Sequence, residues 1–273
     1  MKSFVFLFVV LGSSRQTAGF SNSINSSSLK TNEKLPTKES VDKLKKVLKR
    51  EYSSFFDPMQ REFYASSVTF DDPLTSLSGV EAYQNNVDML ASRTLIGKFL
   101  FKDAGIVLHS ITGGEVSDTD GSISNIITRW TLRITPKVLP WTPTARFTGI
   151  SVYEVSPGGP EGVLINHQTD YWDSINIKEG GEYEKVGKMN AIRDFLSQLN
   201  PENGNAAAAG PELPYQLLRR GKEYEVRSYP SFTAVTVPYD RRDEGYDFLA
   251  SITQGMFCLC VCLSCGRVWY AEV

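Results

Sequence analysis

Histidines, carboxylates and tyrosines are the side chains of this 273-residue chain that could move a proton. The chain has two histidines, His109 and His167, and Asp170 follows the second by three residues. A histidine paired with a carboxylate in an apolar pocket could remove a proton from a carbon acid. On one strand, however, His167 and Asp170 differ in parity, so we expect them to point to opposite faces of a sheet.

The other candidate acids and bases are two aspartates, Asp71 and Asp72, and two tyrosines, Tyr153 and Tyr171. Asp71-Asp72-Pro73 is equally typical of a turn whose carboxylate binds nearby backbone N–H groups. Polar residues beside a pocket commonly have structural roles. We therefore assign no catalytic residue and expect no enzymatic activity.

Three tryptophans, Trp130, Trp141 and Trp172, could form the wall of an apolar ligand site. The alternative is that they fill a core, given how much area each indole buries. Arg129 and Arg133 lie on the strand face opposite Trp130. They are most simply solvated, although they could grip a carboxylate-bearing ligand.

Helices precede the strands that carry these residues. Apolar residues at helical spacing predict a helix over 41–55. Asp57-Pro58 predicts a second helix, with Phe63 and Tyr64 as its buried residues. Ser78-Gly79-Val80-Glu81 has the spacing of a capping box and predicts a third helix over 80–90.

After Gly97 the pattern changes to strands, which we expect over 99–101, 106–111, 126–134, 147–155 and 163–172. Short turn-like connections between them predict an antiparallel sheet. Apolar residues over 186–199 predict a closing helix. Three helices, a sheet and a closing helix predict an α+β domain over residues 36–200.

Four short stretches of this domain resemble a plant and algal family of uncharacterised NTF2-like domains: Leu48-Lys-Arg-Glu-Tyr52, Phe70-Asp-Asp-Pro73, Arg129-Trp130 and Asp170-Tyr171-Trp172. The resemblance implies an α+β cone, in which helices pack on a curved antiparallel sheet. NTF2-like cones include isomerases, dehydratases and plain binding modules, and they can dimerise through the sheet. The fold therefore leaves the reaction open.

A Gly- and Ala-rich stretch, 201–212, predicts a linker before a second unit. Pro214-Tyr-Gln-Leu-Leu-Arg-Arg-Gly-Lys-Glu-Tyr224-Glu-Val-Arg-Ser-Tyr229 resembles the opening of the SOUL/haem-binding-protein family. This resemblance, over about 213–255, implies an apolar groove for haem or another tetrapyrrole, with Tyr224 and Tyr229 as candidate ligand contacts. No histidine follows His167, so the segment offers no imidazole for iron.

All four cysteines lie between Cys258 and Cys265. Their spacing is poor for a zinc site, which usually presents two separated C-x-x-C pairs, so we predict no metal site. The abrupt change at 256–273 is most simply a tail read past an exon boundary. It would leave the tetrapyrrole-binding domain incomplete and its binding impaired.

Residues 1–35 hold no acidic side chain before Glu33 and are rich in serine. They predict a disordered targeting leader, either a secretory signal or a plastid transit peptide. The joint resemblance of the two units to plant plastid proteins favours the plastid. The net charge of −2 and the lack of a basic stripe argue against nucleic-acid binding, and no apolar run is long enough for a transmembrane helix.

Taken together, these features predict a tetrapyrrole-binding or carrier protein, with Trp130, Trp141, Tyr153, His167, Trp172, Tyr224 and Tyr229 as the residues for the ligand. The alternative is an NTF2-like enzyme or dimerising scaffold that takes a small apolar ligand in the cone, with isomerase or dehydratase chemistry.

Overall fold

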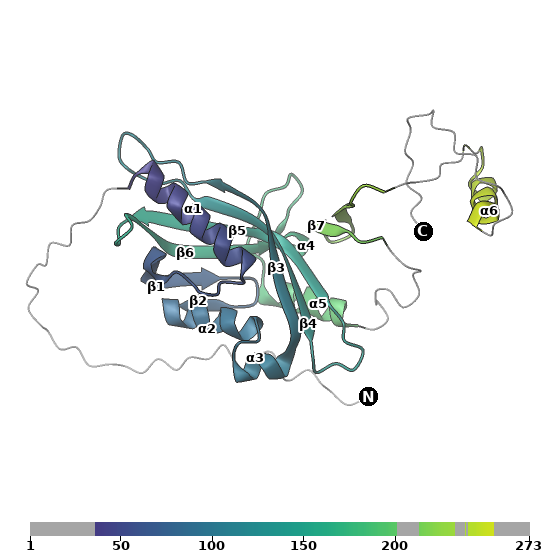
Figure 1. The fold of residues 1–273 in the computed structure, drawn as a ribbon, viewed down its shortest axis with the longest axis horizontal. Helices are drawn as coiled ribbons and strands as arrows, with labels where there is room; N and C mark the ends of the chain where they lie inside the picture. The colour runs from purple at the N-terminus through teal and green to yellow at the C-terminus, as the bar shows by residue number, and fades with distance from the viewer. Residues whose placement is uncertain (1–35, 201–212, 233–237, 239, 254–273) are drawn as a thin grey trace, which may run out of the picture. The chain divides into compact units, whose positions relative to one another are not determined.

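The computed structural model describes residues 36–200, 213–232, 238 and 240–253. They fall into two compact units, the first ending at Ser228 and the second beginning at Tyr229. In the first unit, helices pack on a curved six-stranded sheet (Figure 1). This is the α+β cone that the resemblance to NTF2-like domains predicts, so the expected fold class of residues 36–200 is confirmed.

The first helix forms where its apolar periodicity predicts. Helix α1 spans Lys38–Ser53, and the Thr37 hydroxyl caps it by accepting a hydrogen bond from the Ser40 N–H at 3.2 Å. Val41, Leu44, Leu48 and Tyr52 lie on its buried face. Burial of this stripe holds the helix against the sheet.

The prediction of a helix after Asp57-Pro58 is wrong. Residues Arg61–Phe63 make one 3₁₀ turn, and strand β1 then runs over Tyr64–Asp71. Phe63 and Tyr64 are buried as expected, but Phe63 ends the 3₁₀ turn and Tyr64 begins the strand. Pairing with strands on both sides decides this segment's structure over its helix-start signal.

The next two helices are short. Strand β2 spans Ser76–Ser78, and α2 follows over Val80–Leu90. Gly79, at a φ of 92°, occupies the N-cap, so the predicted side-chain capping box does not form. Residues 99–100, expected in a strand, end α3 (Leu95–Leu100), and β3 then runs unbroken over Phe101–Gly113.

Three long strands complete the sheet: β4 (Ile126–Pro136), β5 (Ala145–Pro157) and β6 (Val163–Trp172). The strand order is β2-β1-β6-β5-β4-β3. All neighbouring strands are antiparallel except β1 and β6, which are parallel. The expectation of a wholly antiparallel sheet is therefore wrong at this pair, because β1, which precedes β6 by about 90 residues, was expected to be a helix.

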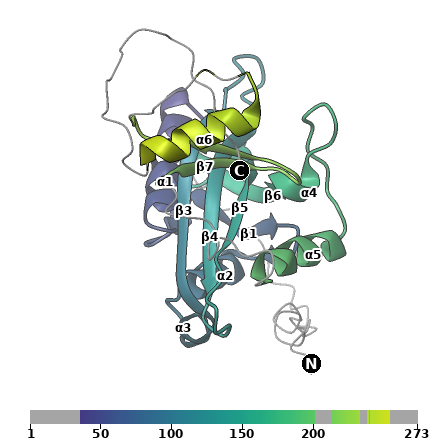
Figure 2. The ribbon, with the colours of Figure 1, turned by 90° about the vertical axis from the view of Figure 1, so that its right-hand side faces the viewer.

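The sheet encloses the core together with α1 and α2, and α4 (Asp173–Asn176) and α5 (Lys188–Leu199) follow β6. Figure 2 shows β3, β4 and β5 running side by side in the sheet. Gly149 of β5 makes close packing possible at the centre. A Cβ there would lie 2.0 Å from the Tyr171 carbonyl oxygen and 3.1 Å from the Trp130 ring.

A β-hairpin packs on the outer face of this sheet. Its strands are β7 (Gln216–Arg220) and β8 (Glu225–Ser228), and β7 contacts β4 and β5. The Thr131 hydroxyl donates a hydrogen bond to the Leu217 carbonyl at 2.7 Å, and the Arg220 N–H donates one to the Thr148 hydroxyl at 2.7 Å. The first unit therefore extends through Ser228, beyond the predicted boundary at 212/213.

The second unit contains helix α6 (Arg242–Thr253). The leader 1–35, the linker 201–212 and the tail 256–273 lie outside the described residues. None of the helices in the described ranges is both long and apolar enough to cross a membrane.

Candidate active site in the cone interior

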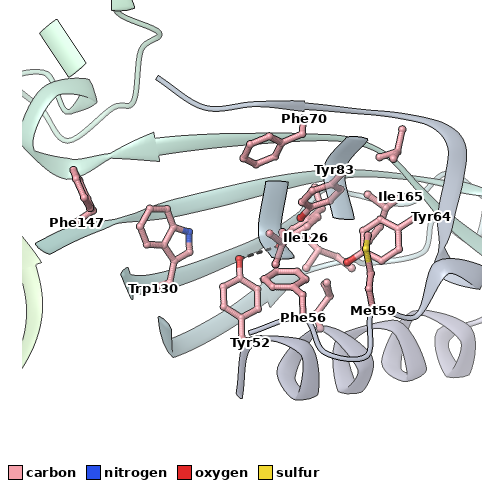
Figure 3. Close-up of a cluster of buried hydrophobic side chains, with 14 of the residues drawn as sticks. Tyr52, Phe56, Met59, Tyr64, Phe70, Tyr83, Ile126, Trp130, Phe147 and Ile165 are labelled. Carbon is pink, nitrogen blue, oxygen red and sulfur yellow. Dashed lines mark hydrogen bonds between the residues drawn. The ribbon is translucent and has the colours of Figure 1, made fainter. Parts of the chain in front are cut away.

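Polar side chains from five elements meet inside the cone. Ser151 on β5 pairs with Asp170 on β6, and Tyr153 pairs with Gln168 on the same two strands. Alternation along a strand sends both members of each pair to one face of the sheet. Tyr52 reaches this face from α1 and Tyr83 reaches it from α2, as Figure 3 shows for the two tyrosines.

These side chains form one hydrogen-bond network, which we call the interior cluster. It consists of Tyr52, Tyr83, Thr128, Trp130, Ser151, Tyr153, Gln168 and Asp170.

One half of the interior cluster centres on the Tyr52 hydroxyl. It lies 2.8 Å from the Thr128 hydroxyl, 3.0 Å from that of Ser151 and 2.9 Å from that of Tyr153. The Trp130 indole N–H donates to the Ser151 hydroxyl at 2.9 Å. The Tyr52 phenol thus connects the hydroxyls of Thr128, Ser151 and Tyr153, and Ser151 extends the network to Trp130.

The other half leads to a carboxylate. The Tyr83 hydroxyl donates to the Gln168 carbonyl oxygen at 2.5 Å, which fixes the orientation of the amide. The Gln168 Nε2 then donates to Asp170 Oδ1 at 2.8 Å and to the Ser151 hydroxyl at 3.3 Å. Asp170 is therefore held by donors that the rest of the network orients.

Asp170 is the accessible end of this network. The other seven members are buried, whereas Asp170 is partly exposed. Among the described residues, no buried side-chain nitrogen or oxygen lacks a hydrogen-bond partner. The buried polar groups of the network thus all have hydrogen-bond partners, and its one partly exposed member is an ionisable group.

Burial raises the pKa of Asp170 from 3.8 to about 7, against the hydrogen bonds from Gln168 and Ser151, which lower it. The negative charge of Asp72 raises the Asp170 pKa further. Asp72 itself has a pKa of about 6, because burial outweighs its hydrogen bonds from the Leu74 and Thr75 N–H groups at 2.7 and 2.5 Å. Asp170 can therefore both lose and accept a proton near neutral pH.

The phenols of the interior cluster behave differently. Burial raises the pKa of Tyr52, Tyr83 and Tyr153 above the ordinary value of 10, and the charge of Asp170 adds to each rise. They remain neutral hydroxyls across the physiological range. They can orient the cluster and relay hydrogen bonds, while Asp170 carries the charge.

The structure separates the predicted ligand residues of the cone. Trp130 and Tyr153 belong to the interior cluster. Trp172 is also buried, with its ring 4.4 Å from that of Phe147. Trp141 lies half-exposed in the loop after β4, where its indole N–H donates to the Leu199 carbonyl at 2.9 Å.

Both histidines lie away from the interior cluster. His167 contacts the hydroxyls of Thr69 and Thr169 and lies 3.8 Å from Asp71. As the strand parity predicts, it shares a face with Thr169, whereas Asp170 shares one with Gln168.

His109 Nε2 lies 2.8 Å from the Thr131 hydroxyl. That hydroxyl gives its proton to Leu217, so His109 donates to it. Burial and the nearby Arg129 charge lower the pKa of His109. Neither histidine is therefore placed to act with Asp170 as a base.

The sequence predicts that Arg129 is solvated, but in the structure its guanidinium is bound by other groups of the protein. It makes a two-pronged ion pair with buried Asp173, with N–O distances of 2.6 and 3.3 Å, and donates to the Leu218 carbonyl at 2.9 Å. The Tyr183 and Thr148 hydroxyls complete the Asp173 site at 2.5 Å each. Arg129 thus grips a carboxylate of its own chain on the outer face, while Arg133 is exposed.

Tyr224 belongs to the first unit, and Tyr229 begins the second. Tyr224 is exposed in the turn between β7 and β8, and the ring of Tyr229 lies 6.3 Å from that of Phe232. Across the described ranges no group of three or more metal-ligating side chains could hold an ion. Tetrapyrrole binding by residues 213–255 stays a prediction.

Asp170 is a candidate by residue type, but the sequence does not single out the residues that organise it. Tyr52 and Tyr83 fall within predicted helices, and neither Ser151 nor Gln168 lies in a motif that suggests chemistry. One signal was available: Ser151 and Tyr153 share one strand parity, and Gln168 and Asp170 share another. Two adjacent strands with polar residues on the core-facing side indicate a buried polar network.

Residues 42–167 match the family described as "Uncharacterized conserved protein (DUF2358)". The match ends before Gln168 and Asp170 and does not extend to residues 213–255. No curated protein matches the chain.

Among solved structures, the chain is similar to an NTF2-like superfamily protein of Salmonella enterica serovar Typhimurium, with 11% identity over 53% of this chain and 98% of that one, at a TM-score of 0.39. It is also similar to a hexachlorocyclohexane dehydrochlorinase of Novosphingobium barchaimii, with 7% identity over 50% and 85% of the two chains, at a TM-score of 0.36. Neither likeness decides what this chain does.

Proposed function

We propose that the cone binds a small, mainly apolar molecule and exchanges a proton with it through Asp170. The observation that carries this proposal is the placement of Asp170. It is the partly exposed end of an otherwise buried network, and its pKa of about 7 keeps both protonation states populated near neutral pH.

The chemistry that suits this arrangement is general acid–base catalysis. An ionised Asp170 would take a proton from a carbon or hydroxyl of the ligand, and the neutral acid would return it at a second position. A proton removed and returned in this way supports isomerisation, and a proton delivered to a leaving hydroxyl supports dehydration. The aromatic residues around the interior cluster favour a ligand that is apolar apart from the reacting group.

The neutral phenols limit the reaction further. Tyr52, Tyr83 and Tyr153 keep their protons at any physiological pH, so none of them is available as a base. Their role in the proposal is to position Gln168 and Ser151, and through these the carboxylate. A variant of Asp170 should therefore lose activity without losing the network that surrounds it.

A spectroscopic probe tests the binding step. 4-Nitrophenol is small, largely apolar and changes colour when it loses its proton. We expect the full-length protein to bind it saturably, with Asp170 accepting its hydrogen bond. Asp170→Asn should weaken binding by about tenfold or more, since a hydrogen bond to a charged group contributes about 1.5–3 kcal/mol.

Asp103→Asn is the matched control, because Asp103 is an exposed β3 carboxylate paired with Arg133 at 3.1 Å. It should leave binding unchanged. Equal affinities for wild type and Asp170→Asn would remove Asp170 from the proposed site.

A further inference from the structure

One end of the cone carries exposed apolar side chains in an arrangement that packing among the described residues does not explain. Helix α3 buries Gly97 and Leu100 but turns Leu95, Ile96 and Phe99 outward. Their exposed fractions are 86%, 52% and 66%. A helix of this kind usually hides its large apolar residues.

The loop after β4 extends the same surface. Its start lies beside the end of α3, since Phe101 pairs with Pro136 and the Lys137 N–H donates to the Leu100 carbonyl at 2.8 Å. Val138 and Trp141 in this loop are each 46% exposed. Figures 1 and 2 both place α3 and the end of β4 at the same end of the molecule.

We call the five side chains Leu95, Ile96, Phe99, Val138 and Trp141 the apolar tip. Exposed apolar side chains gathered at one end of a domain are typical of a binding site for a protein or a membrane.

The charge around the apolar tip is positive. Lys98, Lys102 and Lys137 are exposed and stand between or beside its members. Neither residues 89–102 nor residues 134–153 contain an Asp or Glu. Asp88 and Asp103, which flank the first stretch, are both paired with arginines, at 2.6 Å and 3.1 Å.

We propose that the apolar tip docks on an anionic lipid surface. Leu, Ile, Phe and Trp side chains enter the boundary between headgroups and acyl chains, and lysines beside them contact lipid phosphates. A two-fold contact with a second copy fits less well, because it would bring the three lysines of one copy against those of the other. The proposal goes beyond the proposed function, because Asp170 is no part of the apolar tip.

Flotation of the full-length protein with vesicles tests this directly. One set of vesicles is phosphatidylcholine, and the other contains equal amounts of phosphatidylcholine and phosphatidylglycerol. We expect binding to the second set, with salt weakening it. The double variant Leu95→Ser/Phe99→Ser should lose about tenfold or more in affinity for these vesicles, since each apolar side chain buried in the lipid contributes strongly to the free energy of binding.

Lys98→Glu/Lys102→Glu should also weaken binding about tenfold or more, because each lysine near an anionic surface contributes about a fivefold factor and the reversed charge repels it. The matched controls are Met189→Ser/Leu196→Ser, which changes two exposed apolar residues of α5, and Lys222→Glu in the β7–β8 turn. Both controls should bind like wild type, and that pattern supports the proposal.

Three results would overturn it. The first is a lack of binding to anionic vesicles by the wild-type protein. The second is equal binding by wild type and the α3 double variants, which would place the lipid contact elsewhere in the chain. The third is a wild-type oligomer that Leu95→Ser/Phe99→Ser converts to a monomer, which would make the tip a contact between copies.

Discussion

Replacing Asp170 by asparagine should make the protein more stable at neutral pH. The folded state holds this carboxyl at a pKa of about 7, compared with 3.8 for the exposed group. Above pH 7 the folded protein must therefore ionise a group that burial disfavours. Asparagine keeps the shape of the side chain and removes that requirement.

The magnitude follows from the two pKa values. The Asp170 pKa is 3.8 for the exposed group and about 7 in the folded protein. Above pH 7 this difference lowers the free energy of unfolding of the wild-type protein by about 4 kcal/mol. Asp170 is partly exposed, so solvent reduces this figure, and we expect Asp170→Asn to gain about 2–4 kcal/mol at pH 8. Between about pH 4 and 7 the folded protein binds more protons at this site than the unfolded chain, so wild-type stability falls as pH rises.

Urea unfolding of wild type and Asp170→Asn at pH 4, 6 and 8 measures the effect. The two curves should nearly coincide at pH 4, and the variant should be more stable at pH 8. Asp103→Asn should change stability by less than about 0.5 kcal/mol at each pH. A variant less stable than wild type at pH 8 would contradict this expectation, because it would show that the ionised carboxylate stabilises the fold.

Three further outcomes follow from the structure. Asp173→Asn should destabilise the protein by about 3–5 kcal/mol in urea unfolding, because it leaves the Arg129 charge without its partner; a change below 1 kcal/mol would contradict the buried pair. Arg220→Ala breaks the ion pair with Asp194 at 3.2 Å and should loosen β7, seen as faster amide exchange over 216–220 while β6 stays protected; unchanged exchange would show that the backbone contacts alone hold the hairpin. Residues 1–35 fused to a fluorescent protein should direct it to plastids, and secretion of the fusion would instead favour the signal-peptide alternative.

The sequence predicts well the parts of the fold that local patterns decide. Alternation along β4 correctly assigns Ile126, Trp130 and Ile134 to the core and Arg129 to the other face. Helical spacing likewise finds α1. In both cases the buried face can be identified from the residue types within one element.

Long-range pairing decides the parts that the sequence does not predict. Strand β1 forms because residues 64–71 pair with β6, which follows about 90 residues later. The helix-start signal at Asp57-Pro58 is local and carries no information about this pairing. The hairpin 216–228 resembles the opening of another family, yet it packs on β4 and β5 through Thr131 and Thr148. Neither contact has a signature in the segment itself.

The candidate site is only partly predictable from the sequence, because its properties also depend on contacts between distant segments. Asp170 is a candidate on residue type, but its raised pKa depends on burial by residues from other strands and helices. Alternation along β4 places Arg129 on the face away from the core, which is typical of a solvated residue. The fold brings Asp173 to this face, where it binds Arg129. The charge state of a residue thus depends on distant segments that the local pattern does not reveal.

The proposed proton exchange depends most directly on the ionisation of Asp170. Carboxyl-carbon NMR of protein labelled at aspartate, with Asp170→Asn used to assign the signal, measures its pKa as pH is changed. We expect the Asp170 carboxyl to titrate with a pKa of about 7. A pKa near 4, the ordinary value for an exposed aspartate, would contradict the proposal that this residue exchanges a proton with a bound ligand at neutral pH.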